Sequence, residues 1–231
     1  MRVSRTTMRQ MSTETKETLT EAVQERLIED IVSGILEPGQ NLRIEVLKDQ
    51  YDVGASPLRE ALSRLTSLGF VTNETRRGFR VAPMSEEDLA DLTRLRQMVE
   101  AEALRESITT HDPIWEMELA GSFAKLSLAS TRQYGDPAVA RRMIEAAHRQ
   151  FHRALVGACR SPRILALQEL LYDQASRYRH SIVDAAQTLD GFVESHNTLM
   201  NAALGQDLDV ALRALHDHIA ITPQVVYGRA G

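Results

Sequence analysis

The chain has 231 residues, enough for one large domain or two of ordinary size. Its composition, 43% hydrophobic and 26% charged, excludes an intrinsically disordered chain. No apolar run approaches the length of a membrane span, and the N-terminal residues lack the apolar centre of a signal peptide, so we expect no membrane contact. A single cysteine, Cys159, rules out an internal disulfide, and we expect the reducing cytoplasm as the setting.

The net charge of −5 is unevenly distributed. Residues 1–84 contain 12 Lys or Arg and 12 Asp or Glu, whereas the rest of the chain contains 15 and 20. The stretch from Arg43 to Arg80 has seven basic and five acidic residues. The total charge argues against nucleic-acid binding, and the local basic excess is too small to decide the question.

Three helices are predicted in the first part of the chain, after a polar start over residues 1–17 that we expect to be mobile. The first ends before Gly34, and the second covers residues 44–51. For the third helix, Ser56 is the expected N-cap and Pro57 the expected first helical residue, where its missing N–H costs nothing.

A β-hairpin is predicted after these helices. The segments FVTNE and GFRVAP alternate apolar and polar residues on either side of a basic turn that ends at Gly78. Three helices followed by a hairpin predict a winged helix-turn-helix domain over residues 1–84.

The remaining residues, 85–231, show only helical patterns. Ser85 begins a capping-box pattern, and an N-cap residue precedes proline at Asp112, Asp136 and Ser161. The last two helices are expected over 184–205 and 207–222, with Asp207 as the cap of the second. Six helices with short connections predict an antiparallel all-α bundle, so the whole chain is expected to be mainly α.

The first domain closely resembles the GntR family of bacterial transcription regulators. The segments that carry the resemblance are GILEPGQNL, GASPLREALSRL and GFRV. The helical remainder resembles the FCD domain of the FadR branch. The segments HRQFHRALVGAC and LYDQASRYR are most similar to the carbon-starvation-induced (CsiR-like) regulators.

The resemblance implies a homodimer that binds double-stranded DNA at a pseudo-palindromic operator, with a helix from each copy in the major groove. Arg59 is expected on a base edge or phosphate. Ser56 and Pro57, at the start of that helix, are expected at the phosphates of the DNA backbone. Arg76, Arg77 and Gly78 are expected at the wing, while Arg43 either contacts phosphate or is solvated. Where many relatives carry a second arginine this chain has Ala55, which leaves the operator sequence open.

The histidines at 148 and 152 lie one helical turn apart, at the edge of a stripe that includes Met143, Phe151 and Leu155. From the residues alone they can be metal ligands, hydrogen-bonded core histidines or surface residues. His196 lies within another apolar stripe.

The resemblance favours metal binding by His148, His152, His196 and His218. Many FCD domains have an Asp where His148 stands, and the later pair keeps the family spacing of 22 residues. Four neutral imidazoles suit Zn²⁺, or alternatively Ni²⁺ or another transition metal. They leave the charge of the ion uncompensated, so a small carboxylate is the expected effector.

Three residues are candidates for binding that carboxylate. Arg96 matches an arginine that often binds the effector in FCD domains, and Glu100, one turn further on, is its expected structural partner. Arg94 and Asn197 are further candidates, each of which can instead be an exposed polar residue.

The expected function is therefore a transcriptional regulator, most simply a repressor released by a carboxylate. A metal-responsive regulator is one alternative. A helical-bundle metalloenzyme is another, but that chemistry needs a Glu-x-x-His motif on two helices, and only Glu145 with His148 forms one. We therefore expect no enzymatic activity.

Overall fold

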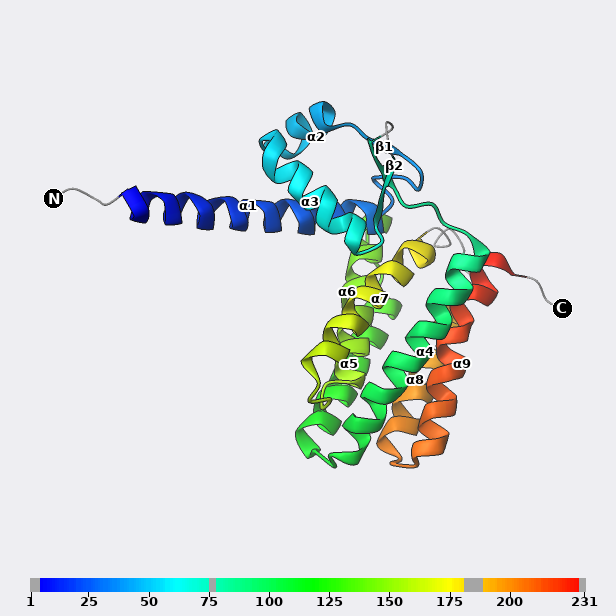
Figure 1. Ribbon diagram of the computed structural model, residues 1–231. Coiled ribbons are helices and arrows are strands. Elements are labelled where there is room, and N and C mark those ends of the chain that lie inside the picture. Colours follow the sequence, from blue (N-terminus) through cyan, green and yellow to red (C-terminus); the bar gives the residue numbers. More distant parts are fainter. Residues whose placement is uncertain (1–4, 75–77, 181–188, 229–231) are drawn as a thin grey trace. The chain divides into compact units, whose positions relative to one another are not determined.

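The computed structural model of the protein describes residues 5–74, 78–180 and 189–228. The chain divides into two compact units, Met1–Ser85 and Glu86–Gly231 (Figure 1). Each unit has buried apolar residues of its own. None of the helices in these ranges is long and apolar enough to cross a membrane.

The first unit combines three helices with a small sheet, which confirms the predicted winged helix-turn-helix fold. Its elements are α1 (Arg5–Val32), β1 (Asn41–Leu42), α2 (Ile44–Tyr51), α3 (Ala55–Ser67), β2 (Val71–Glu74) and β3 (Gly78–Val81). Helix α1 begins at Arg5, so the start that we expected to be mobile is helical from that residue. Helix α2 has the predicted bounds.

The sheet contains one strand that the sequence did not predict. Its order is β1-β3-β2, and β2 pairs with β3 in antiparallel register from Val71 opposite Val81 to Glu74 opposite Gly78. This pair is the predicted hairpin. Strand β1 has only two residues, which is too short for an alternating pattern to be visible in the sequence.

Helix α3 begins at Ala55, two residues earlier than the predicted Pro57. Gly54 is the N-cap, with extended backbone and no side-chain cap, so Ser56 is the second helical residue rather than the cap. Pro57 is third, still within the first turn, where the helix has no use for its missing N–H. The ring of Pro57 is buried with Leu58, Ala61, Leu62 and Leu65.

The second unit consists of six helices in the described residues, which confirms the all-α prediction. They are α4 (Glu86–Thr109), α5 (Pro113–Thr131), α6 (Pro137–Leu155), α7 (Pro162–His180), α8 (Leu189–Leu204) and α9 (Leu208–Tyr227). Four begin at predicted caps, because first-turn amides donate hydrogen bonds to the side chains of Asp112, Asp136, Ser161 and Asp207. Helix α9 runs five residues past its predicted end and contains Pro223.

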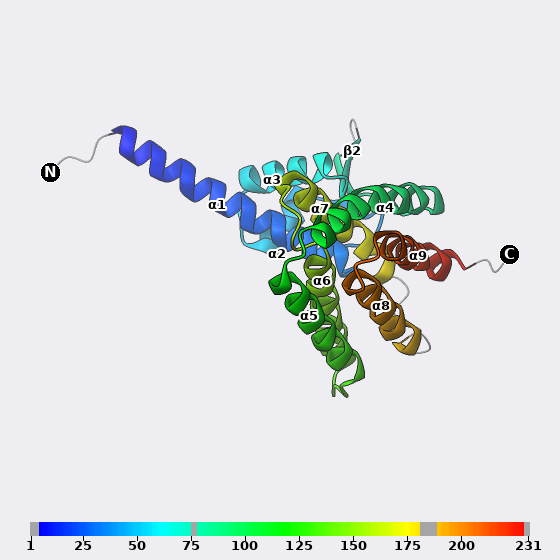
Figure 2. The ribbon, with the colours of Figure 1, turned by 90° about the horizontal axis from the view of Figure 1, so that it is seen from below.

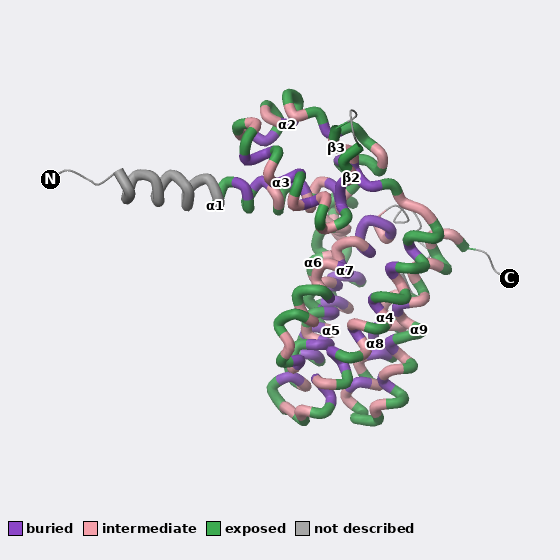
Figure 3. The backbone as a smooth tube through the Cα atoms, in the orientation of Figure 1, coloured by how far each residue is buried: buried purple, intermediate pink, exposed green. Residues whose placement is uncertain are grey.

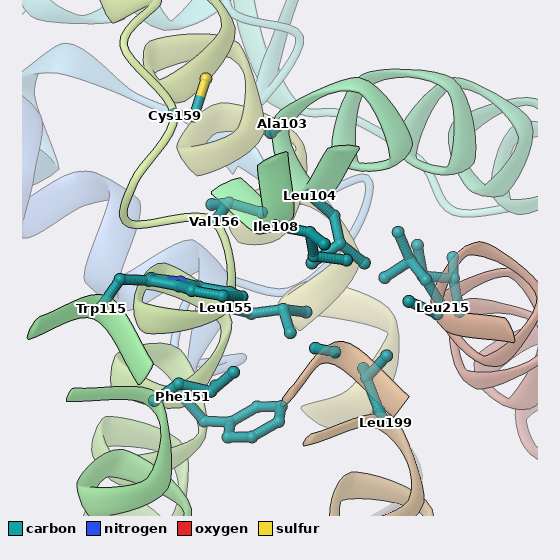
Figure 4. Close-up of a cluster of buried hydrophobic side chains, with 14 of the residues drawn as sticks. Ala103, Leu104, Ile108, Trp115, Phe151, Leu155, Val156, Cys159, Leu199 and Leu215 are labelled. Carbon is teal, nitrogen blue, oxygen red and sulfur yellow. The ribbon is translucent and has the colours of Figure 1, made fainter. Parts of the chain in front are cut away.

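An apolar core holds these helices together. Figure 3 shows buried residues along the inward faces of the helices, and Figure 4 shows the central cluster. Trp115, Phe151 and Leu155 from α5 and α6 meet Leu199 from α8 and Leu215 from α9. The indole N–H of Trp115 donates to the carbonyl of Ala154 at 2.9 Å, so the buried polar atom of this large side chain is satisfied.

Candidate metal centre and candidate nucleic-acid interface

Four histidines meet inside the second unit. His148 and His152 come from α6, His196 from α8 and His218 from α9. One ring nitrogen from each lies within 4.8 Å of those of the other three. His148 and His152 approach with their Nε2 atoms 3.1 Å apart, and the Nε2 atoms of His152 and His218 are 3.4 Å apart.

The separations of 3.1 Å and 3.4 Å fit ligands around one ion. Nitrogen atoms at the usual 2.0–2.1 Å from zinc are about 3.0 Å apart at right angles and about 3.4 Å apart in a tetrahedron. The Nε2 atom of His196 is buried and has no hydrogen-bond partner among the described residues. Without an ion, His148 and His152 can instead share a hydrogen bond, so the geometry admits a metal without requiring one.

In two of the rings, a hydrogen-bond acceptor lies beside Nδ1. The ring proton is then on Nδ1, and Nε2 carries none. The carbonyl of Phe192 lies 2.6 Å from Nδ1 of His196 and accepts its N–H. The hydroxyl of Tyr172 donates to Glu145 at 2.9 Å, and its oxygen is 3.0 Å from Nδ1 of His148, which can donate to it. Such outer hydrogen bonds select the tautomer that binds a metal.

A carboxylate lies behind His152 as well. Glu100 accepts a 2.8 Å hydrogen bond from Nε of Arg96, and both side chains are buried. This confirms the predicted partnership. The second oxygen of Glu100 is 3.8 Å from Nδ1 of His152, beyond hydrogen-bond length, and neither atom has another partner in the described residues.

Burial keeps the four imidazoles neutral. It is the largest cause that lowers the pKa of His148 to about 4 and that of His218 to about 3. It also lowers the pKa of His152 and His196 well below the ordinary value. Neutral rings at pH 7 are the form that binds metal, so no proton has to be displaced there.

Glu145 stays ionised beside these rings. Burial opposes its ionisation, but the nearby charge of Arg179 and hydrogen bonds from neighbours lower its pKa. Ser176 donates to it at 2.9 Å and Arg179 at 3.1 Å. Tyr172, Ser176 and Arg179 follow the helical spacing i, i+4, i+7 within LYDQASRYR, and this spacing could have identified them as one face in the sequence.

The three candidates for effector binding have different surroundings. Arg96 is buried, and its charge lowers the pKa of His148, His152 and His218. Arg94 is exposed and pairs with Asp91 at 2.6 Å. It lies two residues before Arg96, and this spacing places the two side chains on opposite sides of α4. Asn197 accepts a hydrogen bond from Asn201. The structure therefore brings Arg96, but neither Arg94 nor Asn197, to the histidines.

The other histidines lie apart from this cluster. His111 and His216 are exposed, and His180 is half-buried at the end of α7. Met143, which we placed in the buried stripe of α6, is 49% exposed. The buried face of that helix instead consists of His148, Phe151, His152 and Leu155, so its two histidines lie within the stripe rather than at its edge.

In the first unit, a surface hollow of about 910 Å³ is bounded by β1, the start of α2, α3 and the wing. Arg43, Arg59 and Gly78 line it together with Arg80. Arg43 and Arg59 are exposed. Cationic side chains around a concave surface are suited to the phosphates and base edges of DNA.

The remaining candidates at this interface differ in their surroundings. Ser56 is exposed in the first turn of α3, where a phosphate can bind. Pro57 is buried, so it supports the helix from inside and does not face DNA, contrary to our expectation. Arg76 and Arg77 lie outside the described residues. Gly78, at the start of β3, has a φ of +76°, a region that favours glycine.

Comparison with protein-family models shows two matches along the chain. The model for bacterial regulatory proteins of the gntR family matches residues 19–81. The model for the FCD domain matches residues 91–220.

Known proteins resemble the chain over most of its length. The transcriptional regulator BphR of Paraburkholderia xenovorans is 38% identical over 90% of this chain and 85% of its own. The transcriptional repressor GlaR of Escherichia coli is 33% identical over 84% of this chain and 89% of its own. The solved structure of E. coli McbR/YncC has a TM-score of 0.76 at 24% identity, covering 90% of this chain and 97% of that one, and so shares the fold. BphR and McbR are named as transcriptional regulators and GlaR as a transcriptional repressor, and none of the three is named as an enzyme.

Proposed function

Because the chain belongs to the GntR family of bacterial regulatory proteins and carries an FCD domain, it is a transcriptional regulator, and we propose that it is a cytoplasmic repressor. A carboxylate bound beside a metal ion in the second unit releases it from DNA. GlaR, one of the relatives, is named as a repressor. We assign the chain to the FadR branch near the CsiR-like regulators on the segments quoted above.

The DNA-binding step uses the exposed face of the first unit. Helix α3 enters the major groove with Arg59 toward the bases, and Arg43 and the first turn of α3 bind phosphates. One winged helix reads too few bases for useful specificity, so a homodimer occupies two inverted half-sites. This part of the proposal is supported by the position of Arg43 and Arg59 around one hollow.

The metal-binding step uses His148, His152, His196 and His218. When bound, the ion supplies a positive charge that the four neutral imidazoles do not neutralise. Zinc is the first candidate for this ion. Glu100 and Glu145 are already paired with Arg96 and Arg179, so the surroundings add little net charge. An anionic effector is therefore attracted to the site.

Arg96 is the protein group that binds the effector. Its hydrogen bond to Glu100 uses only Nε, one of the five N–H donors of the guanidinium. The same side chain can therefore hold Glu100 and a carboxylate together.

The observation that carries this proposal is the convergence of four imidazole nitrogens within 4.8 Å of one another, three of them on buried side chains and the fourth on the partly buried His218. Elemental analysis of protein purified without chelator tests it, with one equivalent of a transition metal expected. His218→Ala should lose the metal. The matched control is His216→Ala, two residues away on α9 and exposed. Equal metal content in both variants would reject the site.

The alternatives are separated by titrating operator binding with metal ions and organic acids independently. Release by an acid at constant metal supports the carboxylate effector. Control of binding by the metal alone indicates a metal-responsive regulator instead. Turnover of a substrate by the loaded protein would favour the metalloenzyme, which now has little support because the related proteins are regulators.

A further inference from the structure

Helix α5 has an apolar stripe on its exposed face. Ile114, Met117 and Leu128 have exposed fractions of 60%, 68% and 65%. With the exposed residues Gly121 and Ala124, they follow the spacing 3, 4, 3, 4, the pattern of a helix that packs against another along its length. The opposite face, with Trp115, Leu119 and Leu126, faces the core of the unit.

The glycine in this stripe has no explanation within the chain. Gly121 lies in the interior of a helix, where glycine is about 1 kcal/mol less favourable than alanine. It has no positive φ, and a Cβ added there would meet no atom within 4 Å. Space that nothing in the described chain fills suggests that another backbone approaches closely at this point.

Two opposite charges lie beside the stripe on either side of Gly121, three residues before it and four residues after it. Glu118 and Lys125 are both exposed and form no ion pair with any described residue. A second α5 that crosses antiparallel at Gly121 would place Glu118 of each copy beside Lys125 of the other. It would also place Ile114 of each copy near Leu128 of the other.

We infer that the stripe on α5 is the contact between the second units of a homodimer, with a two-fold axis at Gly121. The inference rests on the dimer in the proposed function and identifies its surface. A two-fold contact must match itself, and a single helix with this symmetry does so. Figure 2 shows α5 beside α6 within the unit, and α5 also packs against α8.

A disulfide cross-link tests the geometry. Packed helix axes lie about 8–10 Å apart, and the Cα radius is about 2.3 Å, so the two Cα atoms at the axis are about 3.4–5.4 Å apart. This range overlaps that of disulfides, about 4.4–6.8 Å. Full-length Gly121→Cys should therefore form a covalent dimer under mild oxidation.

Two controls accompany the cross-link. The wild type tests the buried Cys159, and Arg213→Cys introduces an exposed cysteine on α9. Neither should cross-link at a comparable rate. Equal rates for Gly121→Cys and Arg213→Cys would indicate random collision and overturn the inference.

A charge exchange tests the same contact without relying on a new bond. Glu118→Lys or Lys125→Glu turns both attractive pairs into repulsive ones, and each should weaken the dimer about tenfold. The double variant restores opposite charges and should return the Kd to within about threefold of the wild type. The two positions are seven residues apart, too far for restoration to arise within one helix.

The outcomes separate this inference from the proposed function. A wild type that is dimeric and binds its operator, with no cross-link and no charge effect, would overturn the α5 contact and leave the regulator intact. A wild type that sediments as a monomer on its operator would reject the dimer as well, while metal content and DNA binding remain separately measurable.

Discussion

The two units differ in where they keep their charged and polar functional groups. In the first unit, Arg43 and Arg59 are exposed around a hollow, above a core of apolar residues. In the second unit the histidine cluster, Arg96 and Glu100 are inside the helical bundle. A surface cation can be changed with little effect on folding, whereas a buried polar group affects stability as well as function.

The difference follows from the ligands that each unit is proposed to bind. DNA is a large polyanion that attracts exposed cations at long range. A metal ion must be held by several groups at fixed short distances, which buried helices provide. We therefore expect substitutions in the first unit to separate function from stability, and substitutions in the second to change both.

The largest effect is expected from removing two ligands. His152→Ala with His196→Ala should reduce the metal content to below about a tenth of an equivalent and lower the Tm, because the ion joins three helices. Operator binding should remain, since the first unit has its own core. Elemental analysis and thermal unfolding measure this. In the matched control, both exposed residues His111 and His216 are changed to Ala, and metal and Tm should stay unchanged.

The next effect concerns the pH dependence of the metal-free protein. His148 has a folded pKa of about 4 and His218 of about 3, both lowered by burial, while the unfolded chain takes up these protons near the ordinary value of 6.5. The unfolded state therefore binds more protons below pH 6.5, and stability should be lost as the pH falls toward the folded pKa values. The slope is about 1.4 kcal/mol per pH unit for each such histidine.

Denaturant unfolding of protein made metal-free with a chelator, measured between pH 7 and 5, gives this slope. In His148→Ala with His218→Ala the pH dependence should be flatter than in the wild type. An unchanged slope in that variant would show that these rings do not differ between the folded and unfolded states.

A smaller effect is expected from Arg59→Ala. Loss of a base or phosphate contact should weaken operator binding by about 1–3 kcal/mol. The Tm should stay the same, because the side chain is exposed. Arg94→Ala, which removes an exposed charge from the second unit, is the control and should leave DNA binding unchanged. A fall in Tm for Arg59→Ala would contradict the separation of function and stability in the first unit.

The smallest effect is expected from Asp136→Ala at the start of α6. The carboxylate accepts a hydrogen bond from the amide of Ala138, and losing this cap should cost about 1 kcal/mol of unfolding free energy. Metal stoichiometry should not change, because the ligands lie three turns further on. Gln150→Ala, exposed on the same helix, should change stability by less than about 0.5 kcal/mol. A lost metal in Asp136→Ala would mean that the site depends on α6 as a whole.

Local signals predicted the elements that depend on local physics. Asp112, Asp136 and Asp207 mark true helix starts, since a short side chain can satisfy the first-turn amides wherever the helix lies. The hairpin of the wing was also predicted from local signals, namely alternating apolar and polar residues on either side of a turn that ends at Gly78. The predicted start of α3 was wrong by two residues because Gly54 and Ser56 are both acceptable caps, and the fold selects between them.

The sequence by itself determined that His148 and His152 stand side by side, because one helical turn separates them. It also determined the pairing of Arg96 with Glu100 on α4. The family resemblance predicted that His196 and His218 join the first two, and the structure brings these four side chains together. Only the tertiary structure decided that Tyr172 and Glu145 support His148, and that Met143 faces outward. Helical spacing fixes neighbours within a helix, but the face that each helix buries depends on how all six pack together.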